Sequence, residues 1–349
     1  MLRLPDFDFL APRSLAEVVT VLSEAQGDAR VVAGGTDLWP NMKRRHQSAS
    51  SVISLMHIEE LSLIEEREDG LHLGAACRLG DLEDDPRVRS GYPALAAAIA
   101  SISSPPLRNM GTLGGNLCLD TRCTYYNQTE DWRRSISYCM KEQGDICWVA
   151  TSSPRCWAHS ASDSAPVLAA LGASVKLLSK RGVRWLPVSE LYRNDGIAYL
   201  AKERDEILTE ILLPAEAATP LCRSSFWKLR RRGSIDFAVL SVAAAVWLDQ
   251  DEETVSRAAI VLGAVASQPA TATAASEALI GRHLDEEAIS DAATLVRKAI
   301  TPMDNTDFQP QWRGAVAGRY AAGALREIAG LPVERLLPRQ PLLASSDLS

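Results

Sequence analysis

Hydrophobic positions in the first part of the chain follow helical and strand spacings in turn. The capping box Ser14-Leu15-Ala16-Glu17 opens an amphipathic segment and predicts a helix through Leu22. The apolar run 30–33 predicts a short buried strand that ends at Gly34-Gly35. The same reading predicts further strands at 51–55 and 71–75 and helical segments at 58–63 and 79–84. This alternation of small elements indicates a domain of mixed α and β structure.

The pattern changes after a helix rich in alanine. That helix is predicted at 93–102, and Ser103-Ser104-Pro105-Pro106 ends it before the glycine stretch 111–115. From 118 to 161 neither spacing is sustained, and this segment holds five cysteines and three tryptophans. A loop of this length is usually functional or disordered, and its density of Cys and Trp argues against disorder.

Regular patterns resume at 163 and divide the rest of the chain. A helix is predicted at 163–171 and strands at 174–178 and 207–213, before a boundary near Thr219-Pro220. Beyond it the pattern predicts strands at 225–229, 239–248 and 258–266, then helices at 272–280, 286–299 and 312–328. Strands followed by helices are typical of a smaller α+β domain. We therefore expect domains at 1–218 and 219–330 and a tail at 331–349.

Composition excludes several classes of protein. The 349 residues include 44 acidic and 37 basic side chains, and the net charge of −7 argues against a nucleic-acid partner. The largely apolar run 237–248, which only Ser241 interrupts, is shorter than the roughly twenty residues that a membrane helix needs. Pro5, Asp6 and Asp8 interrupt the N-terminal hydrophobic residues, so we expect no signal peptide and a cytoplasmic protein. Disulfides are then a poor explanation for the cysteines.

Two glycine turns carry candidate binding chemistry. One, residues 31–38, follows a predicted strand and contains Gly34-Gly35-Thr36, and the other, residues 109–117, contains Gly111-Thr112-Leu113-Gly114-Gly115. Glycine lets backbone N–H groups approach an anion closely, and a pyrophosphate clamped from both sides would explain the pair. Either turn alone is more often a structural bend. Neither GxGxxG nor GxxxxGK[ST] occurs, so a Rossmann site or a P-loop is not indicated.

The order of these motifs resembles a known family. Val-Ala-Gly-Gly-Thr-Asp-Leu, then Gly-Thr-Leu-Gly-Gly-Asn-Leu-Cys, Ser162-Asp163, and Lys228 before Asp236-Phe237-Ala238 are similar to the FAD-binding subunit of molybdenum hydroxylases. This family includes the flavin subunits of carbon monoxide dehydrogenase and xanthine dehydrogenase. The resemblance covers residues 2 to 330. It implies an α+β fold, with a two-lobed FAD-binding domain and a smaller C-terminal α+β flavoprotein domain.

The resemblance also implies which residues contact FAD. On their own, Asp163 would be a helix N-cap and Lys228 a solvated charge, and the family match reverses both interpretations. The implied cofactor-binding residues are Val32, Ala33, Gly34, Gly35, Thr36, Asp37, Leu38, Ile102, Ser103, Gly111, Thr112, Leu113, Gly114, Gly115, Asn116, Asp163, Leu208 and Lys228.

The cysteine-rich segment is longer than the family pattern requires. Asn116 and Asp163 are 47 positions apart, whereas the matching motifs lie much closer together in ordinary members. The excess, at about 119–161, is therefore an insertion. It contains Cys123, Cys139, Cys147 and Cys156.

Four cysteines in one insertion suggest a shared ligand. Zinc usually takes thiolates from closely spaced pairs, whereas 15, 7 and 8 residues separate these cysteines. An iron–sulfur cluster also takes four thiolates, and wider spacings suit it. Trp132, Trp148 and Trp157 would shield such a cluster from solvent. The residues alone favour an iron–sulfur cluster. Zinc and buried free thiols remain as alternatives.

An insertion of this size at this place resembles the 4-hydroxybenzoyl-CoA reductase branch of the family. That resemblance implies a β subunit whose Cys123, Cys139, Cys147 and Cys156 hold a [4Fe–4S] cluster. It also implies a molybdenum-cofactor α subunit, a γ subunit with [2Fe–2S] clusters, ferredoxin as electron donor and an (αβγ)2 assembly. No catalytic residue is expected on this chain, and its five histidines are scattered.

Two other functions compete with this one. The first is the FAD subunit of a molybdenum hydroxylase that passes electrons to NAD or a quinone and binds structural zinc in the insertion. The second is a nucleotide-binding or zinc-bearing interaction module without a redox role. Cys118 is expected to pack beside the flavin, and Cys77 and Cys222 to be small buried hydrophobic residues.

Overall fold

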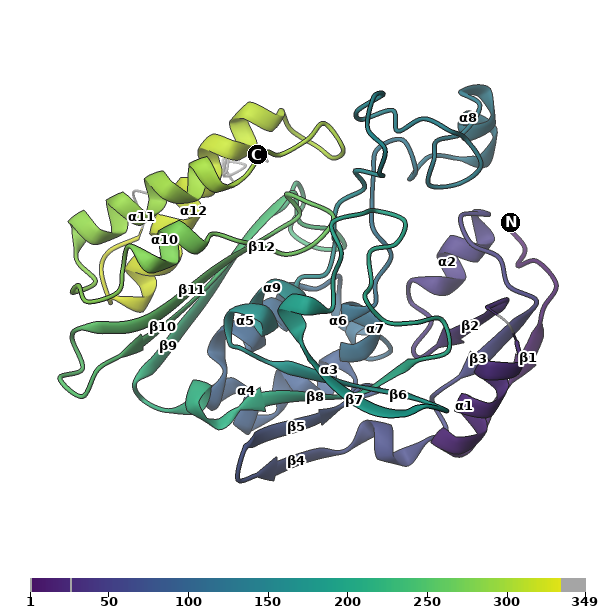
Figure 1. The fold of residues 1–349 in the computed structure, drawn as a ribbon, viewed down its shortest axis with the longest axis horizontal. Helices are drawn as coiled ribbons and strands as arrows, with labels where there is room; N and C mark the ends of the chain where they lie inside the picture. The colour runs from purple at the N-terminus through teal and green to yellow at the C-terminus, as the bar shows by residue number, and fades with distance from the viewer. Residues whose placement is uncertain (1, 26, 334–349) are drawn as a thin grey trace, which may run out of the picture.

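The computed structural model describes residues 2–25 and 27–333 and contains three β-sheets (Figure 1). The first is a parallel sheet of order β1-β3-β2, with strands Asp8–Leu10, Ser51–Ser54 and Ala29–Val32. Helix α1 (Leu15–Glu24) begins at Ser14, whose side chain accepts a hydrogen bond from the Glu17 amide as the capping box predicts. Its Val18 and Leu22 pack with Ile53 in the core of this N-terminal lobe. Helix α2 (Leu38–Lys43) follows the first glycine turn.

The second sheet is antiparallel and has the order β4-β5-β8-β6-β7. Strand β8, predicted at 207–213, lies between strands that come much earlier in the chain. The strands are Ile64–Arg67 (β4), Gly70–Gly74 (β5), Ser174–Ser179 (β6), Gly182–Pro187 (β7) and Ile207–Pro214 (β8). The helices of this lobe are Leu79–Asp84 (α3), Pro86–Gly91 (α4), Pro93–Ser101 (α5), Pro105–Arg108 (α6), Leu113–Leu117 (α7) and Ser164–Ala170 (α9).

The third sheet is antiparallel, with the order β12-β11-β10-β9, and carries the last three helices on one face (Figure 1). Its strands are Cys222–Leu229 (β9), Leu240–Leu248 (β10), Val255–Gly263 (β11) and Ala270–Thr271 (β12), and its helices are Thr273–Glu277 (α10), Glu286–Ala299 (α11) and Pro310–Ile328 (α12). All of β10 is buried because its two faces enter different cores. Val242 and Val246 pack toward α11 and α12, and Ala243 and Ala245 pack with the helices of the second lobe.

Several boundaries differ from the predicted ones. The helical segment expected at 58–63 is a single 3-10 turn, Glu59–Ser62, and the helix expected at 272–280 is shortened to Thr273–Glu277. Two further 3-10 turns lie at Val188–Glu190 and Ala215–Ala218. Short elements such as α7 and β12 have too few residues to show a hydrophobic period, which is why the pattern missed them.

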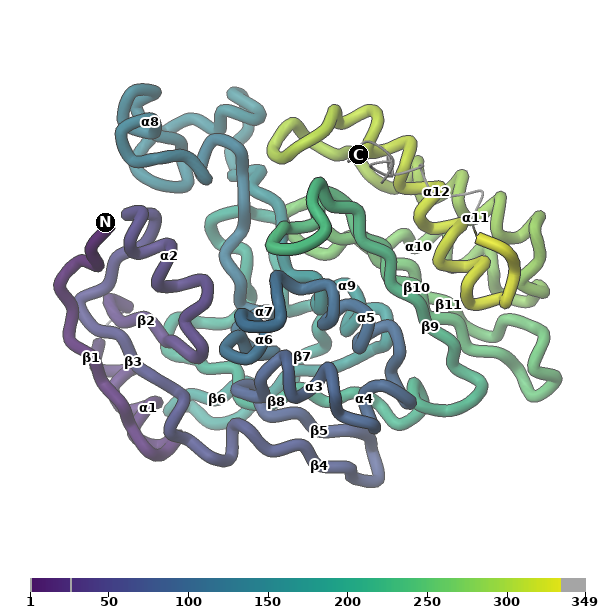
Figure 2. The backbone as a smooth tube through the Cα atoms, turned by 180° about the vertical axis from the view of Figure 1, so that it is seen from behind, coloured from purple at the N-terminus to yellow at the C-terminus, as the bar shows by residue number. Residues whose placement is uncertain are grey.

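The insertion forms an arm that projects from the second lobe, above α2 in both views (Figures 1 and 2). Its one helix among the described residues is α8 (Glu130–Ser135). At the base, Arg122 and His159 exchange backbone hydrogen bonds of 2.9 and 2.7 Å. Further out, the Arg133 guanidinium donates to the Arg44 carbonyl at 3.0 Å, and Asn305 Nδ2 donates to the Trp157 carbonyl at 2.6 Å. The arm is therefore bonded to both neighbouring parts of the molecule.

No helix within the described residues is both long enough and apolar enough to pass through a bilayer.

Candidate functional site

A cavity of about 740 Å³ lies between the N-terminal lobe and the second lobe, and both glycine turns line it. The remaining walls come from the ends of α5 and β8, from the base of the arm and from the loop 197–200. Fifteen of the residues predicted to contact FAD line this cavity: Val32, Ala33, Gly34, Gly35, Thr36, Asp37, Leu38, Ile102, Ser103, Gly111, Thr112, Gly114, Gly115, Asn116 and Leu208. The structure thus brings together two turns that are far apart in the chain.

The first turn needs glycine because it touches the second turn directly. A Cβ atom on Gly34 would lie 1.6 Å from the Met110 carbonyl oxygen, so any side chain there would push the two turns apart. Gly35 has φ +70°, and a Cβ on it would lie 2.0 Å from Trp39 Nε1. The backbone of the two turns therefore forms one continuous cradle.

The second turn is held by its own hydrogen bonds. Thr112 caps helix α7, and its Oγ1 accepts from the Gly115 amide at 3.1 Å. The Gly114 amide donates to the Ala75 carbonyl at 2.9 Å, and a Cβ on Gly114 would lie 2.7 Å from the Ala75 Cβ. These contacts fix the turn before any ligand binds, which suits a backbone cradle for a diphosphate.

Asn116 links this turn to the segment that follows the arm. Its Oδ1 accepts from Ser162 Oγ at 2.8 Å and from Ser164 Oγ at 2.6 Å. The two ends of the insertion are thus joined next to the cavity, which explains why a long insertion leaves the flanking motifs in place.

Three predicted cofactor residues lie outside the lining. Leu113 is fully buried in the hydrophobic core. Asp163 and Lys228 are also buried and pair with each other, with Nζ 2.6 Å from Oδ2. Burial raises the pKa of Asp163, and Lys228 opposes part of that rise. Oδ1 of Asp163 has no hydrogen-bond partner, so one acceptor of this carboxyl group is left for a further donor.

Several cavity residues were missed by the sequence reasoning. Asp120, Tyr199, Lys202 and Phe237 line the cavity, and none of them lies in a glycine motif. Only Phe237 was near a signal, since it follows Asp236 in a family motif. Aromatic and charged residues on loops carry no periodic pattern, so only the fold shows that they converge.

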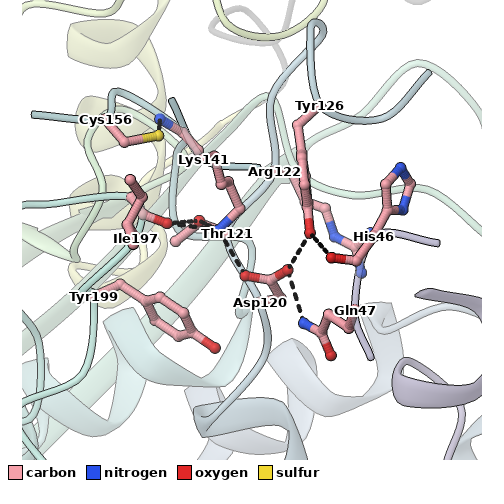
Figure 3. A network of polar contacts seen from close by, with 12 residues as sticks. His46, Gln47, Asp120, Thr121, Arg122, Tyr126, Lys141, Cys156, Ile197 and Tyr199 are labelled. Atoms are coloured by element: carbon pink, nitrogen blue, oxygen red, sulfur yellow. Dashed lines mark hydrogen bonds and ion pairs between the residues drawn. The ribbon is translucent and has the colours of Figure 1, made fainter. Parts of the chain in front are cut away.

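Asp120 is the centre of a polar network at the base of the arm (Figure 3). Its Oδ2 accepts from Gln47 Nε2 at 2.9 Å and from the Tyr126 hydroxyl at 3.4 Å, and its Oδ1 accepts from Lys141 Nζ at 2.8 Å. Lys141 belongs to the arm, and its ammonium is also 5.5 Å from the centroid of the Tyr199 ring. This network connects the cavity wall with the cysteine-rich segment.

The four cysteines of the insertion are all buried and are free thiols. Cys123, Cys139 and Cys156 pack in one small cluster with Tyr126 and Ala158. Cys147 lies beside Cys156, and the interaction between the two thiols lowers the pKa of Cys147. The same interaction, together with burial, raises the pKa of Cys156.

The chemistry of this donor set fits a polynuclear sulfur-bound group. Three of the four thiols, those of Cys123, Cys139 and Cys156, pack in one closed apolar cluster, and Trp148 packs against it. Burial raises the pKa of Cys123 to about 12, so a bound cation would be needed to hold these sulfurs as thiolates together. Trp132, expected to shield the cluster, is 38% exposed and packs on Tyr125 instead. Among the described residues, no three His, Cys, Asp or Glu side chains are grouped closely enough to hold a single metal ion.

The other three cysteines lie outside the cluster of the arm. Cys77 is buried in the hydrophobic core, as predicted. Cys222, expected to be buried, is half-buried in β9 and packs against the same core. Cys118 lines the cavity, and its place beside the flavin stays a prediction.

Family comparisons agree with this geometry. Residues 5–216 match the model of the FAD binding domain in molybdopterin dehydrogenase, and residues 224–328 match the CO dehydrogenase flavoprotein C-terminal domain. The chain belongs to this family of flavoprotein subunits, its fold is α+β, and FAD is its cofactor.

Individual relatives make the class more specific. The chain is 28% identical over 300 residues to the nicotinate dehydrogenase FAD-subunit of Eubacterium barkeri, covering 85% of this chain and 88% of that protein. It is 27% identical to the caffeine dehydrogenase subunit beta of Pseudomonas sp. strain CBB1, covering 94% and 98%. A solved carbon monoxide dehydrogenase from Hydrogenophaga pseudoflava matches with a TM-score of 0.76 and 26% identity, covering 94% of this chain and 99% of that one. The chain is thus an FAD-carrying oxidoreductase subunit of the molybdenum hydroxylase type.

Proposed function

We propose that this chain is the electron-transfer flavo-iron–sulfur subunit of a 4-hydroxybenzoyl-CoA reductase. The observation that carries the proposal is that Cys123, Cys139 and Cys156 pack in one buried cluster on an arm beside the FAD cavity, with the buried Cys147 beside Cys156. Binding of FAD alone does not account for four buried cysteines on one arm. A second one-electron carrier explains them.

The two cofactors would occupy separate parts of the chain. The glycine turns would hold the FAD diphosphate, Ile102, Ser103 and Leu208 would line the flavin part of the cavity, and the four arm cysteines would hold a [4Fe–4S] cluster. FAD takes up and releases electrons singly or in pairs, and an iron–sulfur cluster carries single electrons. The protein supplies rigid attachment, exclusion of water and the surrounding charges.

The substrate reaction would take place on a partner. Reductive dehydroxylation breaks the phenolic C–O bond, consumes an electron pair and two protons, and releases benzoyl-CoA and water. We assign this chemistry to a molybdenum-cofactor α subunit, with a γ subunit carrying [2Fe–2S] clusters, ferredoxin as donor and an (αβγ)2 assembly in the cytoplasm. The medium-chain and subunit names of the relatives support a multi-subunit enzyme. Asp163 and Lys228 would contact the cofactor only if their ion pair opened toward it.

A second candidate is the FAD subunit of a hydroxylase with structural zinc in the arm. The names of the relatives favour it, because they include nicotinate, caffeine and carbon monoxide dehydrogenases. It differs from the first candidate in the metal that it places on the same cysteines.

Iron, acid-labile sulfide, zinc and flavin should be measured on the anaerobically purified complex, together with the variants Cys139→Ser and Cys222→Ser. We expect one FAD per chain in the wild type and about four irons per chain beyond those of the γ subunit's [2Fe–2S] clusters, from the four thiolates that a [4Fe–4S] cluster requires. Cys139→Ser should lose these four irons and keep FAD, and Cys222→Ser, a free cysteine outside the arm, should keep both. Zinc in place of these four irons would support the second candidate, and an iron content that Cys139→Ser leaves unchanged would contradict the first.

A further inference from the structure

Lys141 belongs to the arm but its side chain returns to the arm's base. It lies two residues after Cys139, and its side chain is only 6% exposed. The ammonium group donates to Asp120 Oδ1 at 2.8 Å, to Thr121 Oγ1 at 2.8 Å and to the Gly196 carbonyl at 2.6 Å. All three donors of the ammonium are therefore used, and its charge is held in one place.

The other member of this ion pair faces the flavin cavity. Asp120 lines the cavity together with Gln47 and Tyr199. Gln47 and Tyr126 donate to Oδ2 of Asp120, at 2.9 and 3.4 Å, while Lys141 donates to Oδ1. The negative end of the pair is thus part of the cavity wall.

The positive end lies toward the cysteines. The Cys156 sulfur packs against Gly196, where an added Cβ would lie 2.7 Å from Sγ, and the carbonyl of the same glycine accepts from Lys141. Figure 3 shows both Lys141 and Cys156 on the side of the network away from Gln47. The charge of Lys141 also opposes the burial that raises the pKa of Cys139, and it acts on Cys156 in the same sense.

We infer that Lys141 and Asp120 form an oriented charge pair between the two redox sites and set the difference between their reduction potentials. The inference rests on the proposed function, because it takes the four cysteines to hold an iron–sulfur cluster. Lys141 and Asp120 are positioning residues here, since neither transfers an electron.

The expected effect has a definite direction. A buried cation stabilises the negative charge that an added electron brings to a nearby cluster, and a buried carboxylate destabilises it at a nearby flavin. The pair therefore raises the potential of the cluster and lowers the potential of the flavin. The free energy released when an electron passes from the cluster to the flavin is therefore smaller. This suits a subunit that delivers electrons to a substrate that is difficult to reduce.

The test is a redox titration of both sites in the complete complex, followed by electron paramagnetic resonance and by flavin absorbance. In Lys141→Met the cluster potential should fall, and in Asp120→Asn the flavin potential should rise. Each change should alter the reduced-to-oxidised ratio at least tenfold, which is about 59 mV for the one-electron cluster and about 30 mV for a two-electron flavin couple. Lys141→Arg should restore the wild-type cluster potential in large part.

A matched control is Glu83→Gln, which breaks the Glu83–Arg108 pair in the FAD lobe, where Glu83 does not line the cavity. It should move neither potential. Equal shifts at both sites in the Lys141 and Asp120 variants, or no shift with iron and FAD retained, would overturn the inference. If Lys141→Met lost the iron of the cluster and Asp120→Asn kept the wild-type flavin potential, the pair would have only a structural role at the base of the arm. That result would also overturn the inference.

The outcomes separate this inference from the proposed function. A wild-type complex with no iron beyond that of the γ subunit's [2Fe–2S] clusters would refute the proposed cluster, and the flavin potential of Asp120→Asn would still show whether the carboxylate acts on the cavity. A wild-type complex with iron whose potentials ignore both variants would leave the proposed function standing and refute the inference alone.

Discussion

Lys228 on strand β9 and Asp163 at the start of helix α9 form a buried ion pair, with Nζ 2.6 Å from Oδ2. The Lys228 ammonium also donates to the Ser101 carbonyl at the end of α5, at 3.1 Å. A single side chain thereby joins the third sheet to two helices of the FAD lobe.

Removal of the lysine should destabilise this junction. Lys228→Met leaves a carboxylate buried without its partner, so we expect the free energy of unfolding to fall by about 3–5 kcal/mol. The double variant Lys228→Met/Asp163→Asn should recover part of that loss. Denaturant titration measures both, with Arg231→Met as control because its pair with Asp307 is largely exposed and contributes at most about 1 kcal/mol. A Lys228→Met loss no larger than that of the control would refute the structural role.

Gly34 should be essential for binding FAD. A Cβ there would lie 1.6 Å from the Met110 carbonyl oxygen, so Gly34→Ala must separate the two turns of the cradle. We expect FAD to bind at least tenfold more weakly, a loss of about 1.4 kcal/mol or more, as measured by fluorescence titration of the apoprotein. Gly233→Ala is the matched control, because nothing lies within 4 Å of its added Cβ. Unchanged FAD affinity in Gly34→Ala would show that the turns do not form the cradle.

Gly196 should be essential for the arm rather than for the flavin. Its added Cβ would lie 2.7 Å from Cys156 Sγ and 2.9 Å from the Ala158 amide nitrogen. Gly196→Ala should therefore displace Cys156 and reduce the iron held beyond that of the γ subunit's [2Fe–2S] clusters at least twofold, while FAD remains bound. Iron and flavin analysis checks this, with Gly314→Ala as control since its nearest contact would be 3.9 Å away. Full iron content in Gly196→Ala would contradict the tight packing described for this loop.

His159 at the base of the arm should make stability depend on pH. Burial lowers the pKa of His159 from 6.5 to about 4, so the folded protein favours the neutral ring. This contribution is fully present above pH 6.5 and is lost as the pH falls through the window from 6.5 to about 4, where the unfolded chain binds the proton first. At about 1.4 kcal/mol per pKa unit, the loss amounts to about 3 kcal/mol.

Thermal unfolding at several pH values tests this dependence. The wild type should lose stability between pH 6.5 and 4, and His159→Gln should lose less over the same window. Parallel pH profiles for the two proteins would exclude His159 as the source. The exposed His283 provides the control, because His283→Gln should leave the profile unchanged.

Much of the architecture could be predicted from local patterns. Helices α3 and α11 begin and end at the predicted residues, and strand β6 differs from its prediction by one residue. Elements of this kind can be predicted because a full amphipathic period lies within a short stretch of the chain. The order of strands in the second sheet could not be predicted this way, because β8 pairs with β5 and β6 across long intervals of sequence.

The sequence by itself determined the two glycine turns, the family and the position of the cysteine-rich insertion. Each of these features depends on residues that are close neighbours in the chain, because backbone freedom and motif spacing are local properties. It also supplied four cysteines, but not the fact that they converge.

Only the tertiary structure decided which distant side chains meet. Asp120 and Lys141 are 21 positions apart and Asp163 and Lys228 are 65 apart, and both pairs form where folding removes water from opposite charges. Strand β10 shows that apolar residues are subject to the same limit on prediction. Its apolar sequence predicts that the strand is buried, but not that Val242 and Ala243 enter different cores. Burial and charge pairing depend on the whole packed molecule, so they are settled only when the elements assemble.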